Sequence, residues 1–376
     1  MGYKLLTPGP LTTTATVKQA MRVDHCTWDR EYKTITQEIR QKLLDLAGVS
    51  EADYTTILMQ GSGSFGVESV LSSMIGPKDH VLICVNGAYG RRMVSMCERY
   101  ALLYTVYEVA EDEIPEAAAI AKILEEDPTI TAIAMVHSET TSGILNELEG
   151  IAALANENGL LFIVDAMSSF GGIPIDVSAL SIDFLVSSST KCIQGAPGFS
   201  FILSKREQLE QRRDFARTVS LDLYDQYETM EKDGKWRFTS PTHTVLAFHQ
   251  ALQELEQEGG IYQRYMRYLT NNRLLRQKME ELGYRPFIKN HQGPFITSFL
   301  YPTKQANFTF NTFYQHLKQN GFVIYPGKIS KVDCFRIGNG AVGYQSQSRR
   351  NAALPTAGWR LARRGDGLLP HHRSFH

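Results

Sequence analysis

Five short, continuously apolar segments separated by helix-like stretches constrain the fold of this chain more than any other feature. The segments lie at residues 81–85, 130–136, 160–164, 184–186 and 199–203. Strands that are apolar along their whole length are buried on both faces, which is typical of a parallel sheet covered by helices. We therefore expect an α/β domain with a mostly parallel sheet. An antiparallel α+β arrangement is the alternative, which the regular alternation of strands and helices favours less.

The sequence changes in character after Pro241, where long helical patterns replace the short apolar segments. Residues 245–258 and 262–282 read as long helices, and they are followed by an apolar segment at 295–300, a helix at 310–319 and an extended segment at 321–326. These patterns predict a smaller α+β unit. The expected division is a large cofactor-binding domain over 1–250, a small C-terminal domain over 251–340 and an atypical tail over 341–376.

Charge and cysteine content narrow the class of protein. Lys and Arg number 39 against 40 Asp and Glu, for a net charge of −1, whereas proteins that bind nucleic acid or membrane surfaces usually carry a basic excess. The five cysteines are scattered and odd in number, which argues against a disulfide framework and favours a reducing compartment. The first residues do not resemble a signal peptide, and the longest apolar runs are too short to cross a bilayer. We therefore expect a soluble cytoplasmic protein without a nucleic-acid or membrane partner.

A turn of small residues, Gly61-Ser62-Gly63-Ser64, follows a strand-like segment at 55–60. Apolar residues spaced along one face of a helix come next, at positions 67, 70, 71, 74 and 75. Free N–H groups and the positive end of the dipole at a helix N-terminus favour an anion, and glycine lets the backbone approach a phosphate. The turn therefore indicates a phosphate site, and the alternative is a serine-capped helix after an ordinary tight turn.

Asp165 and Lys191 each follow an apolar strand segment and stand among small residues. Because ligands bind beyond the carboxyl ends of parallel strands, both side chains are expected at the ligand edge of the sheet if their strands are neighbours. An aspartate there can hold a cationic nitrogen, a metal or a ribose, or it can simply cap the following turn. The lysine can be catalytic, or it can be a solvated surface residue.

Together these segments match the needs of pyridoxal 5′-phosphate, which requires a lysine, an anionic partner for its ring nitrogen and a cup for its phosphate. Lys191, Asp165 and the turn at 61–64 supply these three. Tyr89 comes just after a strand and can stack on the cofactor ring, although a lone tyrosine is more often a packing residue. A nicotinamide enzyme explains the lysine less well, and no Gly-x-Gly-x-x-Gly follows the first strand.

Several motifs resemble those of the class V aminotransferase family. They lie at 6–10 (Leu-Thr-Pro-Gly-Pro), 61–64, 86–90 (Asn-Gly-Ala-Tyr-Gly), 137–143, 165–174 and 190–195 (Thr-Lys-Cys-Ile-Gln-Gly). Segments at 235–244, 321–328 and 333–339 are similar to the branch of the family that moves the amino group of 2-aminoethylphosphonate to pyruvate. The resemblance covers residues 3–339. It implies a fold type I homodimer with active sites at the subunit interface, and a step of phosphonate catabolism that yields phosphonoacetaldehyde and L-alanine.

The resemblance also implies a role for each candidate site residue. Lys191 would carry the cofactor and move the proton, and Asp165 would pair with the ring nitrogen. Tyr89 would stack on the ring, Thr140 would approach the ring hydroxyl, and Arg336 would bind the anionic end of the substrate. The phosphate would be held by small polar residues, namely Ser62, Gly63, Ser64 and Thr190, together with Thr239 and Ser240 of the partner subunit.

The resemblance ends after Asn339, where an Arg/Gly/Pro/His-rich segment replaces the terminal helix of the family. This change leads to the hypothesis of a reading-frame change near codon 340, which resequencing of the gene would test. Two alternatives stay open: a related class V aminotransferase that uses serine or alanine with glyoxylate, and, because of the altered tail, a cofactor-binding protein with impaired catalysis. His137 and His243 are interpreted as structural residues and Cys192 as a packing residue, so no metal site is expected.

Overall fold

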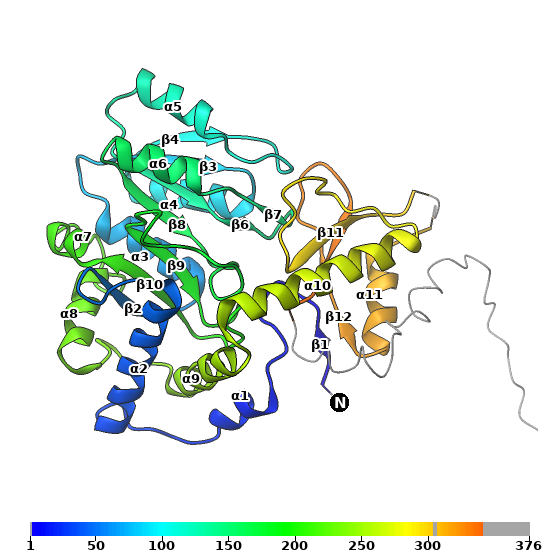
Figure 1. Cartoon of the computed structure of the whole chain (residues 1–376), viewed down its shortest axis with the longest axis horizontal. Coiled ribbons are helices and arrows are strands. Elements are labelled where there is room, and N and C mark those ends of the chain that lie inside the picture. Colours follow the sequence, from blue (N-terminus) through cyan, green and yellow to red (C-terminus); the bar gives the residue numbers. More distant parts are fainter. Residues whose placement is uncertain (1, 304–306, 341–376) are drawn as a thin grey trace, which may run out of the picture.

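The structure of the chain, a computed structural model, describes residues 2–303 and 307–340. It comprises a large unit built on a seven-stranded sheet and a smaller unit built on a three-stranded sheet. Helix α10 (Gly260–Glu281) runs between the two units (Figure 1). The reading-frame hypothesis concerns residues outside those that the structure describes.

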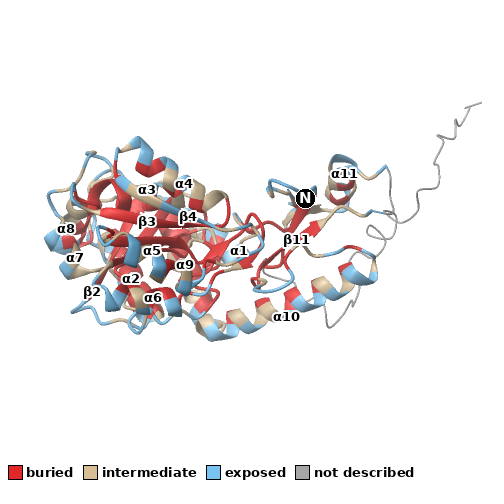
Figure 2. Cartoon of the chain, turned by 90° about the horizontal axis from the view of Figure 1, so that it is seen from above, coloured by how far each residue is buried: buried red, intermediate tan, exposed pale blue. Residues whose placement is uncertain are grey.

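The central sheet has the strand order β2-β10-β9-β8-β5-β3-β4. Strand β10 is antiparallel to both of its neighbours and the remaining pairings are parallel, so the expected mostly parallel α/β sheet is confirmed. The inner strands are buried along their whole length, which is why their sequences are continuously apolar (Figure 2). The strands are β2 (Tyr54–Gln60), β3 (His80–Val85), β4 (Leu103–Glu108), β5 (Ala132–Val136), β8 (Leu161–Asp165), β9 (Phe184–Ser188) and β10 (Phe199–Lys205).

Strand β4 was not among the expected strands. It lies at the edge of the sheet, where its one neighbour is β3, and no residue of it is fully buried. Polar and apolar residues therefore share the segment, and the continuous apolar run that marked the inner strands is absent from its sequence.

Helices cover both faces of the central sheet and complete two hydrophobic cores. The core on one face includes Val70 of α3, Met93 of α4 and Leu223 of α8. The core on the other face includes Leu43 of α2 and Phe248 of α9. The helices are α1 (Ala15–Ala20), α2 (Arg30–Ala47), α3 (Gly63–Met74), α4 (Ala88–Arg99), α5 (Ala117–Glu126), α6 (Glu149–Glu157), α7 (Arg206–Gln211), α8 (Leu223–Asp233) and α9 (Thr242–Gln257). None of the described helices is long and apolar enough to cross a membrane.

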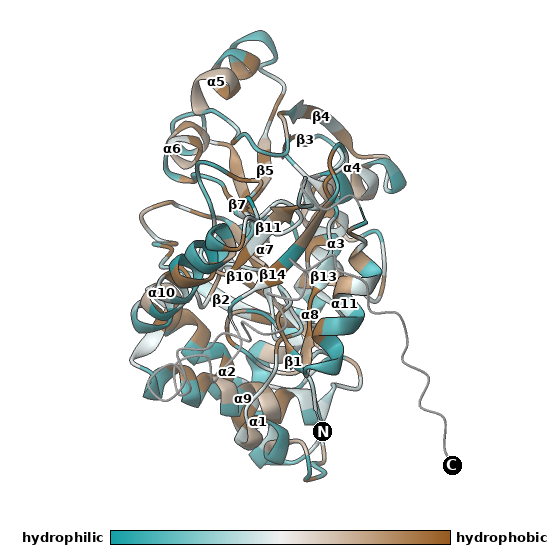
Figure 3. Ribbon diagram, turned by 90° about the vertical axis from the view of Figure 1, so that its right-hand side faces the viewer, coloured by the Kyte–Doolittle hydropathy of each residue, from teal (hydrophilic) through white to brown (hydrophobic). Residues whose placement is uncertain are grey.

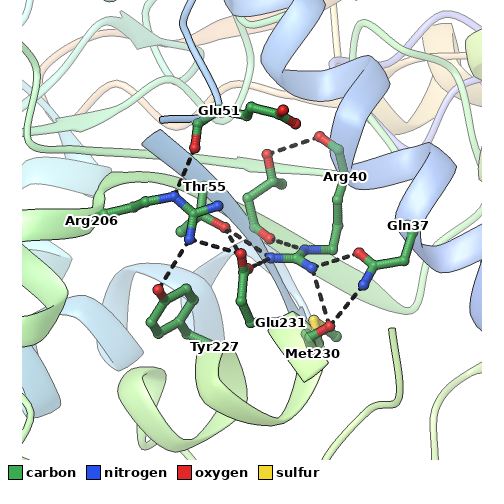
Figure 4. Close-up of polar contacts among 9 residues, drawn as sticks. Gln37, Arg40, Glu51, Thr55, Arg206, Tyr227, Met230 and Glu231 are labelled. Atoms are coloured by element: carbon green, nitrogen blue, oxygen red, sulfur yellow. Dashed lines mark hydrogen bonds and ion pairs between the residues drawn. The ribbon is translucent and has the colours of Figure 1, made fainter. Parts of the chain in front are cut away.

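An ion pair between a buried arginine and an exposed glutamate ties α2 to α8 next to β2 (Figure 4). Arg40 of α2 lies 2.5 Å from the Glu231 carboxylate and also donates to the carbonyl oxygen of Thr56 at 2.7 Å. Arg206 approaches the second oxygen of Glu231 at 2.8 Å. These contacts lie at the β2 edge of the sheet and serve the packing of the large unit.

The small unit consists of an antiparallel sheet, a helix and a short parallel pair. Its sheet has the order β11-β14-β13, and α11 packs beside it through Phe313 and Leu317. Helix α10 is largely hydrophilic (Figure 3), and its buried residues include the polar Arg264, Asn271 and Asn272. The elements are β11 (Ile296–Leu300), α11 (Phe310–Gln319), β12 (Phe322–Val323), β13 (Tyr325–Pro326) and β14 (Cys334–Gly338).

The N-terminal segment belongs in space with the small unit. Strand β1 (Lys4–Leu5) pairs in parallel with β12, and Leu6 enters the core of the small unit. The segment continues past β14, where the Gly338 N–H donates to the carbonyl oxygen of Leu6 at 2.9 Å. The division of the chain at residue 250 stays a prediction.

Candidate active site

The candidate site residues of the large unit gather at the carboxyl edge of the central sheet. Asp165 is the last residue of β8, Lys191 follows β9, and Tyr89 follows β3. Strands β8 and β9 are hydrogen-bonded neighbours, which meets the condition that the sequence left open. Thr140 follows β6 (Ser138–Glu139), which pairs with β7 (Ile144–Leu145) above the same edge. A cavity between α3 and α4 is lined in part by Gly63, Ser64, Tyr89, Arg92, Asp165 and Met167.

The amine of Lys191 lies in a setting that favours its neutral form. Its side chain runs along the backbone of the N-terminal segment, so that a Cβ added to Gly9 would meet Lys191 Nζ at 3.0 Å. Burial lowers the pKa of Lys191 to about 8, the Asp165 carboxylate opposes this shift, and Arg336 and Arg92 reinforce it. A lysine with such a pKa is partly unprotonated near neutral pH, as a general base must be.

The loop that carries Lys191 is held from α10. Arg264 donates to the carbonyl oxygen of Cys192 at 2.7 Å, and the Tyr268 hydroxyl donates to the same oxygen at 3.3 Å. The Cys192 thiol donates to the carbonyl oxygen of Ser168 at 3.1 Å, and burial raises its pKa to about 12. The thiol is therefore unreactive, which agrees with its interpretation as a packing residue.

Asp165 presents a buried carboxylate to the cavity. One of its oxygens accepts a hydrogen bond from the Met167 N–H at 2.8 Å. Burial raises the pKa of Asp165 to about 6, and the Met167 N–H lowers it in part. A cation placed beside the carboxylate would favour its ionised form, so the residue suits a protonated ring nitrogen.

The turn before α3 has the features of a phosphate cup. Ser62 is the N-cap of α3 but makes no side-chain capping bond, so the first N–H groups of the helix are left for another acceptor. A Cβ added to Gly63 would lie 2.1 Å from the sulfur of Met167, which explains the glycine by close approach. Ser64 Oγ accepts a hydrogen bond from Arg92 at 2.7 Å, and the guanidinium carbon lies 5.0 Å from the centre of the Tyr89 ring.

Thr140 and Arg336 connect the small unit to this edge. Arg336, on β14, is buried and donates to the carbonyl oxygen of Pro326 at 3.0 Å and to that of Thr140 at 3.1 Å. The Thr140 hydroxyl is buried without a hydrogen-bond partner among the described residues. A buried unpaired hydroxyl carries a free-energy cost unless a ligand satisfies it. These residues therefore fit a bound group that offers a hydrogen-bonding oxygen.

The remaining phosphate residues do not line the cavity of the single chain. Thr190 is half-buried next to Lys191. Thr239 is exposed, whereas Ser240 is buried and its hydroxyl lies 2.6 Å from that of Tyr32. Their contribution to the phosphate site from a partner subunit stays a prediction.

The two histidines have structural surroundings, and no metal-binding group of His, Cys, Asp or Glu occurs among residues 2–303 and 307–340. His137 is buried with Nδ1 2.9 Å from the Ser169 hydroxyl, and burial lowers its pKa to about 4. His243 pairs with the exposed Asp24 at 3.0 Å.

Two site residues, Arg92 and Glu139, were not predicted from the sequence. Arg92 lies three residues after Tyr89, and residues at this spacing share a helix face, so the signal was present once α4 was known to begin at Ala88. Glu139 lies in a motif that the resemblance included, but nothing in its spacing showed that its carboxylate reaches the Tyr89 turn.

Comparisons with known proteins agree with this geometry. The family model described as aminotransferase class-V matches residues 16–328. The 2-aminoethylphosphonate–pyruvate transaminase of Lysinibacillus sphaericus (strain C3-41) is 55% identical over 338 residues, which cover 90% of this chain and 92% of the relative. The transaminase of the same name from Bacillus anthracis is 55% identical over 339 residues, again 90% of this chain and 92% of the relative.

Solved structures show the same fold at lower identity. An alanine–glyoxylate aminotransferase from Nostoc sp. superposes with a TM-score of 0.87 at 24% identity, covering 97% of this chain and 96% of the other. A pyridoxamine–pyruvate aminotransferase from Mesorhizobium loti superposes with a TM-score of 0.83 at 22% identity, covering 96% of both chains. The expected fold type I architecture is thereby confirmed.

Proposed function

The chain belongs to the aminotransferase class-V family, and from this premise we propose that it moves the amino group of 2-aminoethylphosphonate to pyruvate. The products are phosphonoacetaldehyde and L-alanine, and the reaction is a step of phosphonate catabolism. One observation supports this chemistry. The Lys191 amine and the Asp165 carboxylate interact at the ends of neighbouring strands, and Arg336 donates a hydrogen bond to the Thr140 carbonyl beside them. The choice of substrates rests on the 55% identity to relatives that bear this name.

The cofactor is pyridoxal 5′-phosphate, and the residues present fit it. The unpaired Thr140 hydroxyl, the uncapped N-terminus of α3 and the close approach at Gly63 match a ligand with a ring hydroxyl and a phosphate. When bound, this cofactor supplies a carbonyl that takes up the amino group and a ring that withdraws electrons from the neighbouring carbon.

Lys191 and Asp165 manage the protons of the reaction. The neutral Lys191 Nζ takes a proton from the substrate carbon that bears the nitrogen and would deliver it to the cofactor carbon on the other side of that nitrogen. Its pKa of about 8 suits both transfers near neutral pH. The Asp165 carboxylate holds the proton of the ring nitrogen. Tyr89 covers one face of the ring and excludes water from it, and Arg92 steadies both the tyrosine and Ser64.

Arg336 holds the anionic end of each substrate in turn. The phosphonate of one substrate and the carboxylate of the other both accept paired hydrogen bonds from a guanidinium. Two backbone carbonyls fix the orientation of Arg336 before either substrate arrives, which lowers the entropy lost on binding.

The active enzyme is proposed to be a cytoplasmic homodimer. Five free cysteines, four of them buried, suit a reducing compartment. An exposed apolar pair, Val219 and Phe238, lies beside Thr239, and Arg237 joins it by donating to the Val219 carbonyl oxygen and covering the Phe238 ring. Burial of this pair by a second copy would bring Thr239 and Ser240 of the partner subunit to the phosphate.

Purified protein reconstituted with the cofactor tests the proposal. We expect alanine to form from pyruvate only when 2-aminoethylphosphonate is present, and we expect Lys191→Ala to abolish this activity. Serine or alanine with glyoxylate serves as the alternative substrate pair. Faster turnover of that pair would assign the chain to another activity of the same family.

A further inference from the structure

A buried carboxylate that the proposed mechanism does not use lies beside the site. Glu139 is fully buried, and three donors point at it. One oxygen accepts from the Tyr89 N–H at 2.9 Å, and the other accepts from the Thr141 N–H at 3.1 Å and from the Thr141 hydroxyl at 2.5 Å. Because all three neighbours donate, the position requires a group with acceptors on both ends.

Glu139 caps helix α4 from another element. The helix begins at Ala88, its N-cap is Gly87, and no side chain of its own caps it. Glu139 of β6 provides the missing acceptor in the first turn, where the helix dipole favours a negative charge. A Cβ added to Gly87 would lie 2.4 Å from Glu139 Cγ, so this glycine is explained by the passage of the side chain.

The same carboxylate organises the turn that follows it. By binding both the N–H and the hydroxyl of Thr141, Glu139 holds the chain on the far side of Thr140. The Thr140 hydroxyl is the unpaired group assigned to the cofactor, and the Thr140 carbonyl accepts from Arg336. Three groups with separate tasks are therefore joined through one side chain: the stacking ring, the hydroxyl partner and the substrate arginine.

We propose that Glu139 is a positioning residue that joins the Tyr89 turn and the Thr140–Thr141 turn into one rigid unit, so that the cofactor and substrate sites are set together. This inference deepens the proposed function and rests on it. Both carboxylate oxygens of Glu139 already accept from backbone or hydroxyl donors, so the proposal assigns it no direct contact with a ligand.

Glu139→Gln is the sharpest substitution, because it preserves the size of the side chain. An amide has one acceptor end and one donor end, so its NH2 group must face either the Tyr89 N–H or the Thr141 N–H. One buried N–H loses its acceptor whichever way the amide turns. The expected rise in the cofactor dissociation constant is about 5- to 100-fold, the effect of one unsatisfied buried donor.

The measurements separate positioning from general stability. Apoprotein is titrated with pyridoxal phosphate, and the visible circular dichroism of the bound cofactor reports how its ring is held. In Glu139→Gln we expect weaker binding, a reduced dichroic band and raised KM values for both substrates. The matched control is Glu231→Gln, which breaks the Arg40 pair of Figure 4 and should lower the unfolding temperature while leaving cofactor binding and the dichroic band unchanged.

Thr141→Val is the second variant, in case Glu139→Gln does not fold. It keeps the shape of Thr141 and removes only the hydroxyl donor, so we expect a rise in the cofactor dissociation constant of about 2- to 10-fold. The inference is overturned if the variant that folds binds cofactor within twofold of the wild type with an unaltered dichroic band. Because cofactor affinity and the dichroic band are measured without substrate, a failure of the wild type to use 2-aminoethylphosphonate would contradict the proposed function alone.

Discussion

At the scale of single residues, the site depends on a lysine that is costly to keep charged. Burial lowers the pKa of Lys191 to about 8 in the folded chain, from 10.5 for a free side chain. Below pH 8 both the folded and the unfolded chain carry the proton, so the cost of burying the charge is fully present. Between about 8 and 10.5 the unfolded chain binds more protons than the folded one, and stability rises with pH.

Lys191→Met should therefore stabilise the apoprotein in a pH-dependent way. We expect the variant to exceed the wild type in free energy of unfolding by about 1–3 kcal/mol at pH 7, and the advantage to fade as the pH approaches 10.5. Urea unfolding of both proteins across this range measures the difference. An advantage that grew with pH would contradict the assigned burial of the amine.

Arg336→Lys tests the residue proposed to bind both substrates. Lysine keeps the charge but loses the planar pair of donors, and it cannot keep both contacts to the carbonyls of Pro326 and Thr140. We expect KM to rise about 10- to 100-fold for 2-aminoethylphosphonate and for pyruvate, with cofactor binding unchanged. Steady-state kinetics with each substrate varied in turn provides the measurement. A rise for only one substrate would show that the other is bound elsewhere.

Much of the site was predictable from short stretches of sequence, whereas residues whose role depends on contacts with other elements were not. Lys191 and Asp165 stood out because each ends an apolar strand, a signal contained in a few consecutive residues. Glu139 and Arg92 did not, because their importance lies in contacts with another element: Glu139 reaches the turn before α4, and Arg92 reaches Ser64 of α3. Spacing along a chain cannot report such contacts until the elements are placed in space.

At the scale of elements, the N-terminal segment packs closely against the small unit. Gly338 of β14 touches it so closely that an added Cβ would lie 2.3 Å from the carbonyl oxygen of Thr7. Backbone atoms cannot swing aside as a side chain can. Two residues further along, Gly9 lies against the side chain of Lys191. A substitution on β14 should therefore lower the free energy of unfolding and also disturb the position of Lys191.

Gly338→Ala should lower the free energy of unfolding by about 1–3 kcal/mol, the usual cost of overpacking a filled region. The strand geometry itself tolerates alanine, so the loss would come from the displaced segment. Thermal unfolding measures it, and Gly2→Ala is the matched control because a Cβ there meets nothing within 4 Å. Equal stabilities of the two variants would show that the segment moves aside freely.

The secondary-structure elements differed in how well they could be predicted from the sequence. The inner strands were predicted because burial on both faces requires apolar residues throughout. Edge strand β4 was missed because it lacks that requirement, and the antiparallel direction of β10 was not predicted because the run at 199–203 reads the same in either direction. The pairing of β1 with β12 could not be predicted, because two-residue strands carry no periodicity.

At the scale of the whole molecule, the proposed site is shared between units and between copies. Lys191 and Asp165 come from the large unit, Arg336 from the small one, and Thr239 and Ser240 are assigned to the partner subunit. The Phe238 side chain is 48% exposed in the single chain, and Val219 is 72% exposed. Exposed large apolar residues that lie together usually mark an interface.

Phe238→Asp should therefore convert a dimer into a monomer. We expect the wild type to sediment with twice the chain mass of 42.3 kDa and the variant with that mass alone. Loss of the partner's phosphate ligands should also weaken cofactor binding. Tyr262→Asp serves as the control, because Tyr262 is 61% exposed and belongs to another element, α10. If the wild type sedimented as a monomer, the partner subunit could not contribute residues to the site.

The pairing of β1 with β12 also bears on how the polypeptide is made. Lys4 and Phe322 are register partners, so β1 must wait for more than three hundred further residues to be made before its neighbour exists. Closing so long a loop costs only about 0.6 kcal/mol more for each doubling of its length, but such distant contacts form late in folding. The segment that lies against Lys191 therefore takes its place late, and a nascent chain completes its lysine pocket only after β12 has been made.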